Sequence, residues 1–163
     1  MDFPILSWMI FIPLIGGMFI LCTPKEMEKT IKALALVFSF IPLVLAGMVY
    51  VNFNPKIADL QFIEKILWIP AFNIHYYVGL DGLSISIFLL TALLTFLSIL
   101  ISCGITKRVK EYFILFLILE TGMLGVFVAL DLFLFYIFWE VVLLPMYFLI
   151  GVWGGPRRKY AAI

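Results

Sequence analysis

The chain has 163 residues, of which 65% are hydrophobic and 13% charged, and its formal net charge is +1. Soluble domains are about 45–50% apolar and about 25% charged, and one of this size buries only about 70% of the surface that its unfolded chain exposes. The composition therefore excludes an ordinary soluble globule, gives no support for nucleic-acid binding, and predicts an all-α integral membrane protein in contact with the lipid bilayer.

Three apolar runs have the length of a membrane span. A bilayer core of about 30 Å takes roughly 20 residues of helix, and the runs at 3–22, 31–51 and 80–103 meet this requirement. The first run is not expected to be a cleaved signal peptide, because it lacks a basic region before it and a small-residue cleavage site after it. We therefore expect three transmembrane helices at these positions.

A fourth apolar stretch runs from residue 112 to residue 153 and is interrupted only by Glu120, Asp131 and Glu140. It is about twice as long as one membrane span, so the chain must turn back once within it. Asp131 lies near its centre, and a negative charge is favourable at a helix N-terminus. We expect a fourth helix at about 112–130 and a fifth at about 132–153, which gives five spans in one membrane domain over 1–163.

The connection at 52–79 is the only sizeable polar segment. Residues 72–76 alternate between apolar and polar side chains, which favours a short strand or hairpin on the outer surface. Trp68, Tyr76 and Tyr77 suit the membrane interface. His75, the only histidine, is interpreted as a surface residue and not as a proton relay.

Basic residues are distributed unequally between the two sets of connections. Two of them, Lys56 and Lys65, lie in the 52–79 loop, and the other nine lie on the opposite side. Because cationic loops stay in the cytoplasm, the sequence predicts an N-terminus outside the cell and residue 163 on the cytoplasmic side. The nine are Lys25, Lys29, Lys32, Lys107, Arg108, Lys110, Arg157, Arg158 and Lys159.

Glu140 carries the strongest functional signal in the sequence. It lies nine residues after Asp131 and thirteen before Trp153, far from either membrane interface. A carboxylate at this depth costs about 2.5–3.5 kcal/mol on insertion scales, and such residues mark ion pathways, proton relays or buried ion pairs. Tyr136 and Tyr147 share its helical face. We interpret Glu140 as a proton relay; the alternative is a buried ion pair that serves assembly alone.

Pro145 adds a second polar feature to the same helix. Because proline has no N–H group, the carbonyl of Val141 loses its helical donor. A free carbonyl is tolerated at membrane depth only where protein or water satisfies it. Tyr136, Tyr147 and Pro145 are therefore candidates for the lining of a hydrated path beside Glu140.

Glu120 is a second acid within a predicted span. Gly122 and Gly125 follow it, and such small residues permit the close approach of another helix. The sequence leaves two interpretations open, a second proton relay and a carboxyl group hydrogen-bonded at a helix contact. No nucleotide loop and no Cys or His cluster for a metal or haem accompanies these acids, so we expect no cofactor and no metal site in this chain.

Two segments together resemble a known family. The first is the segment 77–84, YVGLDGLS. The second runs from Glu120 to Trp153 and includes Trp139-Glu140 and the run 145–151, PMYFLIG. Both are similar to segments of the antiporter-like subunits of respiratory complex I. The form of the second stretch is that of subunit M (chain 4) of NADH:quinone oxidoreductase. The resemblance covers nearly the whole chain.

The resemblance implies a proton-translocating subunit of an NADH:quinone oxidoreductase in a bacterial-type inner membrane. Electron transfer would occur elsewhere in the complex, which as a whole would use NAD(H), FMN, iron–sulfur clusters and quinone. The partners of this chain would be other membrane subunits, the lipid bilayer and protons. In the family the glutamate at the position of Glu140 is essential and pairs with a lysine on helix seven, which lies beyond residue 163. Members have about fourteen helices, so the resemblance implies that the sequence is a truncated N-terminal part of a longer subunit.

Two other functions stay open at this point. One is a subunit of a multi-subunit cation/proton antiporter or of a membrane-bound hydrogenase, which shares the same ancestry. The other is a truncated fragment without function. The residues alone do not identify the electron donor or the quinone.

Overall fold

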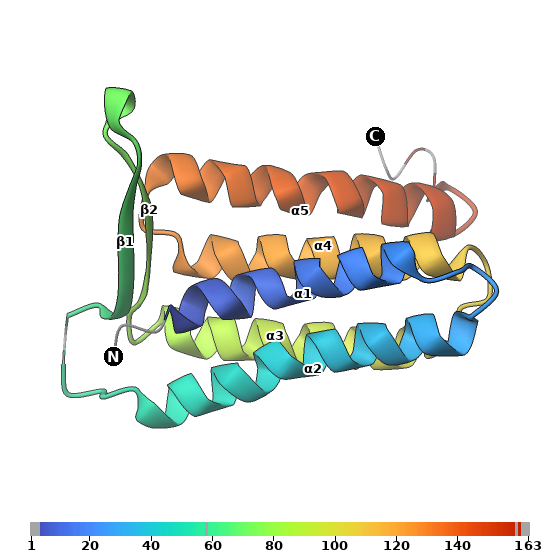
Figure 1. Cartoon of the computed structure of the whole chain (residues 1–163), viewed down its shortest axis with the longest axis horizontal. Coiled ribbons are helices and arrows are strands. Elements are labelled where there is room, and N and C mark those ends of the chain that lie inside the picture. Colours follow the sequence, from blue (N-terminus) through green and yellow to red (C-terminus); the bar gives the residue numbers. More distant parts are fainter. Residues whose placement is uncertain (1–3, 58, 159, 161–163) are drawn as a thin grey trace.

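The computed structural model describes residues 4–57, 59–158 and 160, and within them five helices are long and apolar enough to cross a membrane. They run side by side with their axes nearly aligned (Figure 1), which confirms the predicted all-α membrane class. The helices are α1 (Ile5–Cys22), α2 (Glu28–Asn52), α3 (Ser84–Ile101), α4 (Val109–Val128) and α5 (Leu132–Trp153).

Helix α4 lies at the centre of the bundle and packs against α1, α2, α3 and α5. Small residues make the closest approaches. A Cβ atom added to Gly16 would lie 2.5 Å from the Phe38 side chain, so α1 and α2 meet there. Added to Gly125, it would lie 2.3 Å from the ring of Phe138, so α4 and α5 meet at this glycine. These contacts are the small-residue packing that membrane helices use.

The helix bounds differ from the expected ranges where polar residues continue a helix. Helices α2 and α4 each begin three residues before the expected range, at Glu28 and Val109. Hydropathy marks the apolar part of a span, whereas helical hydrogen bonding continues into the polar interface. Helix α3 begins at Ser84 instead of residue 80, because residues up to Leu80 belong to a strand, and it continues into the short helix η2 (Ser102–Gly104).

Helices α2 and α3 are connected by a β-hairpin. Strand β1 (Gln61–Ile69) pairs antiparallel with β2 (Ile74–Leu80), and η1 (Pro70–Phe72) forms the turn. The alternation at 72–76 predicted a short strand or hairpin, and a hairpin is present. Its second strand begins only at Ile74, because Phe72 ends η1 and Asn73 takes the left-handed conformation with φ 53°. The hairpin crosses the end of the bundle at a steep angle to the helices (Figure 1). We call this the hairpin end.

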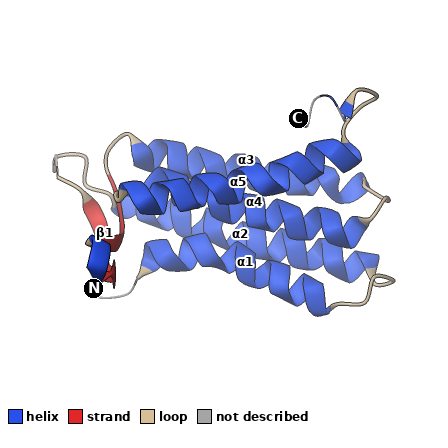
Figure 2. Ribbon diagram, turned by 90° about the horizontal axis from the view of Figure 1, so that it is seen from above, coloured by secondary structure: helices blue, strands red, loops and turns tan. Residues whose placement is uncertain are grey.

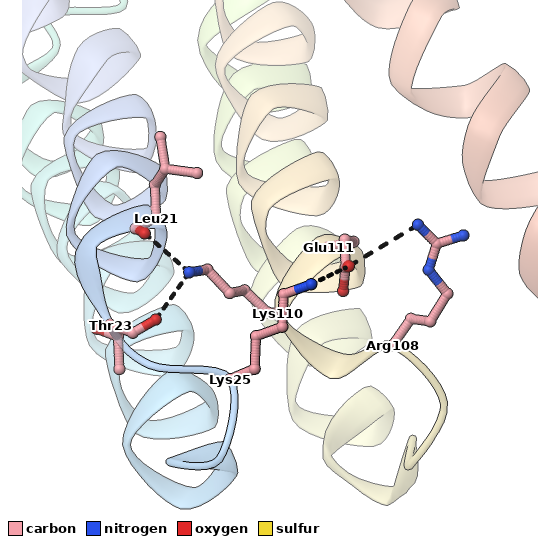
Figure 3. A network of polar contacts seen from close by, with 6 residues as sticks. All are labelled: Leu21, Thr23, Lys25, Arg108, Lys110 and Glu111. Carbon is pink, nitrogen blue, oxygen red and sulfur yellow. Dashed lines mark hydrogen bonds and ion pairs between the residues drawn. The ribbon is translucent and has the colours of Figure 1, made fainter.

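The opposite end, here the basic end, carries the α1–α2 and α3–α4 connections and the end of α5 (Figure 2). Lys110 donates to the carbonyls of Leu21 and Thr23 at 2.8 Å each and so satisfies the C-terminus of α1 (Figure 3). Glu111 lies 3.3 Å from Lys25 and 3.8 Å from Arg108. These ion pairs are largely exposed and contribute at most about 1 kcal/mol each.

Candidate functional site

Glu140 lies in the middle of α5 on a face that no other described helix covers. Its side chain is exposed, and so are those of Tyr136 and Tyr147, with exposed fractions of 58% and 50%. At about 100° per residue these three positions fall within an arc of about 40°. The face they share, which we call the Glu140 face, therefore places one carboxylate between two phenols.

Pro145 lies on a different side of α5. It is buried, whereas Glu140 is exposed, and the two positions are about 140° apart around the helix. Val141 is only partly exposed and contributes to a cavity on the packed side of α5. The structure thus leaves Tyr136, Glu140 and Tyr147 exposed along one face of α5 but does not place Pro145 on that face.

Glu120 has the opposite environment. Its side chain is 0% exposed, and neither of its carboxylate oxygens has a hydrogen-bond partner among the described residues. It lies on the same stripe of α4 as Leu117 and Leu124. Leu117 belongs to the apolar cluster at the basic end and Leu124 to the cluster at the hairpin end. Glu120 is therefore enclosed where the two halves of the apolar core meet.

The two acids point in different directions. Gly122 and Gly125, which contact Val142 and Phe138 of α5, mark the side of α4 that faces α5. They lie about 200° and 140° around α4 from Glu120. Glu120 therefore points away from α5 and toward the bundle of α1, α2 and α3, while Glu140 lies on the far side of α5. The structure contains two separate carboxyl environments.

A cavity of about 620 Å³ lies between α1, α4, α5 and the hairpin. It could not be predicted from the sequence, because four segments far apart in the chain form its walls. Its polar side chains are Thr121, whose hydroxyl donates to the carbonyl of Leu117 at 3.2 Å, and Tyr76. The apolar side chains and the indole that complete the lining are Phe11, Leu14, Ile66, Leu67, Trp68, Ile118, Leu134, Ile137, Phe138 and Val141.

The remaining candidate ligands are dispersed. Within the described ranges, no three His, Cys, Asp or Glu side chains are grouped so that they could hold a metal ion. Cys22 and Cys103 are free thiols. His75 is partly exposed on β2, and its backbone N–H donates to Asp131 at 3.2 Å. Asp131, the expected corner, is the N-cap of α5.

The chain is similar in sequence to membrane subunits of NADH:quinone oxidoreductases. The family described as NADH:quinone oxidoreductase/Mrp antiporter, TM, matches residues 129–163. NADH-ubiquinone oxidoreductase chain 4 of Marchantia polymorpha is 39% identical over 158 residues, which is 96% of this chain and 32% of that protein. NADH-quinone oxidoreductase subunit M of Rickettsia typhi is 36% identical over 100% of this chain and 34% of its own length. The chain thus spans about a third of the length of these relatives.

Two solved structures share the fold. Respiratory complex I from Thermus thermophilus with bound NADH contains a chain that matches with a TM-score of 0.80 and 26% identity, over 96% of this chain and 31% of that one. A membrane-bound sulfane sulfur reductase, an archaeal respiratory membrane complex, matches with a TM-score of 0.75 and 20% identity, over 90% of this chain and 23% of that one. The second likeness concerns the fold alone.

Proposed function

We propose that this chain, which resembles subunit M (chain 4) of NADH:quinone oxidoreductases over nearly its whole length, acts in a proton-translocating membrane subunit of a complex I-type enzyme. The observation that carries the proposal is the 36–39% identity to chain 4 and subunit M proteins over 96–100% of this chain. The five packed helices agree with it, since a chain of a respiratory complex I has the same arrangement.

Glu140 is the proposed proton relay of this segment. Its carboxyl group is halfway along α5 and is not neutralised by any ion pair that the structure describes. A lone carboxylate facing hydrocarbon is costly, so its face requires polar neighbours or water in the assembled protein. Tyr136 and Tyr147 supply hydroxyl groups that can donate to a carboxylate or pass a proton along. Pro145 leaves the carbonyl of Val141 without a helical donor, but both residues lie on the packed side of α5. Any hydrated path that they line would therefore be separate from the Glu140 face.

Glu120 is the proposed second relay. A buried carboxyl group that lacks a hydrogen-bond partner has to be explained by water or by a protonated state. Either condition allows it to exchange a proton with a hydrated neighbour. Its enclosure by α1–α4 separates it from the Glu140 face, so the two acids would serve different parts of a path and not one carboxylate pair.

The chemistry of electron transfer belongs to other subunits in this proposal. NAD(H), FMN, iron–sulfur clusters and quinone would be bound elsewhere in the complex, and the present chain would contact neighbouring membrane subunits. The proposed location is a bacterial-type inner membrane, with the hairpin end outside. The concentration of Lys and Arg at the basic end supports this orientation. Residue 163, predicted to be cytoplasmic, lies outside the described residues.

Affinity purification from the source membrane tests the proposed function. We expect a tagged form of the protein to copurify with subunits that carry FMN and iron–sulfur clusters, and the preparation to reduce quinone with NADH. Copurification with antiporter subunits alone, without a dehydrogenase, would contradict the proposal and favour the cation/proton antiporter. That alternative has specific support, because the matching family description includes Mrp antiporters.

Cysteine labelling of intact cells tests the orientation. Phe72, exposed in the hairpin turn, and Lys29, exposed at the basic end, provide a matched pair of positions. With Cys22 and Cys103 replaced by serine, a membrane-impermeant maleimide should label Phe72→Cys in intact cells. It should label Lys29→Cys only after the cells are opened. The reverse pattern would invert the proposed topology.

A further inference from the structure

Glu64 of strand β1 closes the N-terminus of a helix that lies almost sixty residues earlier in the chain. Its carboxylate accepts hydrogen bonds from the backbone N–H of Leu6 at 2.7 Å, from that of Ser7 at 3.2 Å and from the Ser7 hydroxyl. The first N–H groups of a helix have no intrahelical partner. Pro4, at the N-cap position of α1, offers no side-chain acceptor, so the hairpin supplies the cap that α1 lacks.

Tyr76 on the paired strand completes this contact. Its hydroxyl lies 2.7 Å from the Ser7 hydroxyl, so both strands of the hairpin reach the same turn of α1. Burial raises the pKa of the Tyr76 phenol above its ordinary value, while its hydrogen bond to Ser7 acts in the opposite direction. The phenol therefore remains a neutral donor, and Glu64, Ser7 and Tyr76 form one hydrogen-bonded group.

Asp131 makes a similar contact at the other side of the hairpin. Its carboxylate accepts from the backbone N–H of Phe133 at 2.9 Å and from that of Leu134 at 3.3 Å, which caps α5. It also accepts from the backbone N–H of His75 on β2. The Leu130 N–H donates to the carbonyl of Tyr77 at 2.9 Å. Strand β2 is thereby fixed to the corner between α4 and α5.

Helices α1 and α5 each pack against α4, and the 620 Å³ cavity lies between them at the hairpin end. The hairpin crosses this end of the bundle (Figure 1). We propose that Glu64 and Asp131 make the hairpin a strap that sets the place of α5, and with it Glu140, relative to α1. Both are positioning residues that act through the backbone of the helices they cap. The consequence for Glu140 rests on the proposed function, whereas the strap itself does not.

Reversible cross-linking in the full complex tests the strap. Ser7→Cys and Glu64→Cys are combined, with Cys22 and Cys103 replaced by serine, and treated with a short bis-methanethiosulfonate reagent. We expect rapid cross-linking of this pair. The control combines Ser7→Cys with Phe72→Cys. Five strand residues, about 16 Å, separate Glu64 from the turn that contains Phe72, so this pair should not react. Absence of cross-linking in the first pair would overturn the proposed contact.

Substitutions of Glu64, together with the double-cysteine variant, distinguish a positioning role from a contribution to stability alone. Glu64→Ala should lower the unfolding midpoint by about 2–8 °C and lower the number of protons translocated per electron. Glu64→Gln, which keeps one acceptor oxygen, should lose less of both. The cross-linked double-cysteine variant should translocate protons like its parent, and cleavage of the linker by a reductant should reduce it to the level of Glu64→Ala. A reduced form that keeps the parental ratio would overturn the positioning role.

Failure of the proposed function gives a different result. If the parent complex translocates no protons at all, the function proposed above is wrong. The cross-linking rates and unfolding midpoints of the same variants would still decide whether the strap exists.

Discussion

Helices α4 and α5 each carry one carboxyl group near their middle, but this chain surrounds the two helices very differently. Ten residues of α4 are buried, among them Glu120, because α4 has neighbours on every side. Only three residues of α5 are buried: Leu134, Phe138 and Pro145. Glu120 therefore has a complete environment within the present chain, whereas Glu140 lies on a surface that still has to be covered by lipid, water or protein.

This difference gives the two carboxyl groups different electrostatic environments. A carboxyl group enclosed by apolar side chains is costly to ionise, since burial penalises the charged form. A carboxyl group on an open face can acquire a partner that stabilises its charge. The ionisation of Glu140, on a face with two phenols, should therefore depend more on its neighbours than the ionisation of Glu120 does. Variants of the two helices test this contrast.

Glu140→Gln should have the largest effect. The amide preserves shape but cannot exchange a proton, so proton translocation should fall by a factor on the order of 100. Assembly should be largely intact, because the amide keeps the shape of the side chain and no described residue forms an ion pair with Glu140. Proton uptake by inside-out vesicles measures the effect, with Glu26→Gln in the exposed α1–α2 connection as the control. An unchanged proton-to-electron ratio would remove Glu140 from the path.

Gly125→Ala should weaken the contact that holds the two helices together. The added Cβ would lie 2.3 Å from the ring of Phe138, so one helix must shift, at a cost of about 1–3 kcal/mol. Gly47→Ala in α2 is the matched control, since nothing lies within 4 Å of its added Cβ. It should be neutral or stabilising by up to about 1 kcal/mol through helix propensity. Thermal unfolding in detergent compares them, and equal midpoints would contradict the described packing.

Glu120→Gln should reduce proton translocation less than Glu140→Gln does, by less than about tenfold. The reason is that its carboxyl group is fully enclosed by the bundle and is costly to ionise, whereas Glu140 lies on an open face that can acquire a partner. Glu120→Met should leave the unfolding midpoint unchanged or raise it, because a buried polar group without a partner is replaced by an apolar one. Translocation equal to the parent in both variants would assign Glu120 to packing.

Asp131 at the corner between the two helices should make the smallest contribution, and this contribution should depend on pH. Hydrogen bonds from the backbone N–H groups of His75, Leu134 and Phe133 lower the pKa of its carboxyl group from the ordinary 3.8, while slight desolvation opposes them. A lowered pKa in the folded state gives stability that is present above the unfolded value and lost as pH falls through the folded one. The unfolding midpoint should therefore drop as the pH falls below about 4, and Asp131→Asn should make that drop shallower. Parallel curves for the two proteins would exclude this linkage.

The sequence alone determined the membrane class, the five helices and the two intramembrane acids. Twenty or so consecutive apolar residues have only one stable arrangement in a bilayer, because each backbone N–H and C=O must be satisfied within its own helix. The corner at Asp131 follows for the same reason, since an apolar run of forty-two residues must fold back. These features depend on residues close together in the sequence and can therefore be predicted from it.

Only the tertiary structure decided which helix faces are covered and which residues far apart in the sequence contact each other. Periodicity placed Tyr136, Glu140 and Tyr147 on one face. It did not show that no described helix covers this face or that Glu120 points away from it. Strand β1 and the contacts of Glu64 with α1 also lay beyond prediction, because a hydrogen bond across fifty-eight positions leaves no local pattern. Helix spacing fixes which side chains share a face; only the packing of α1, α4 and α5 decides what that face meets.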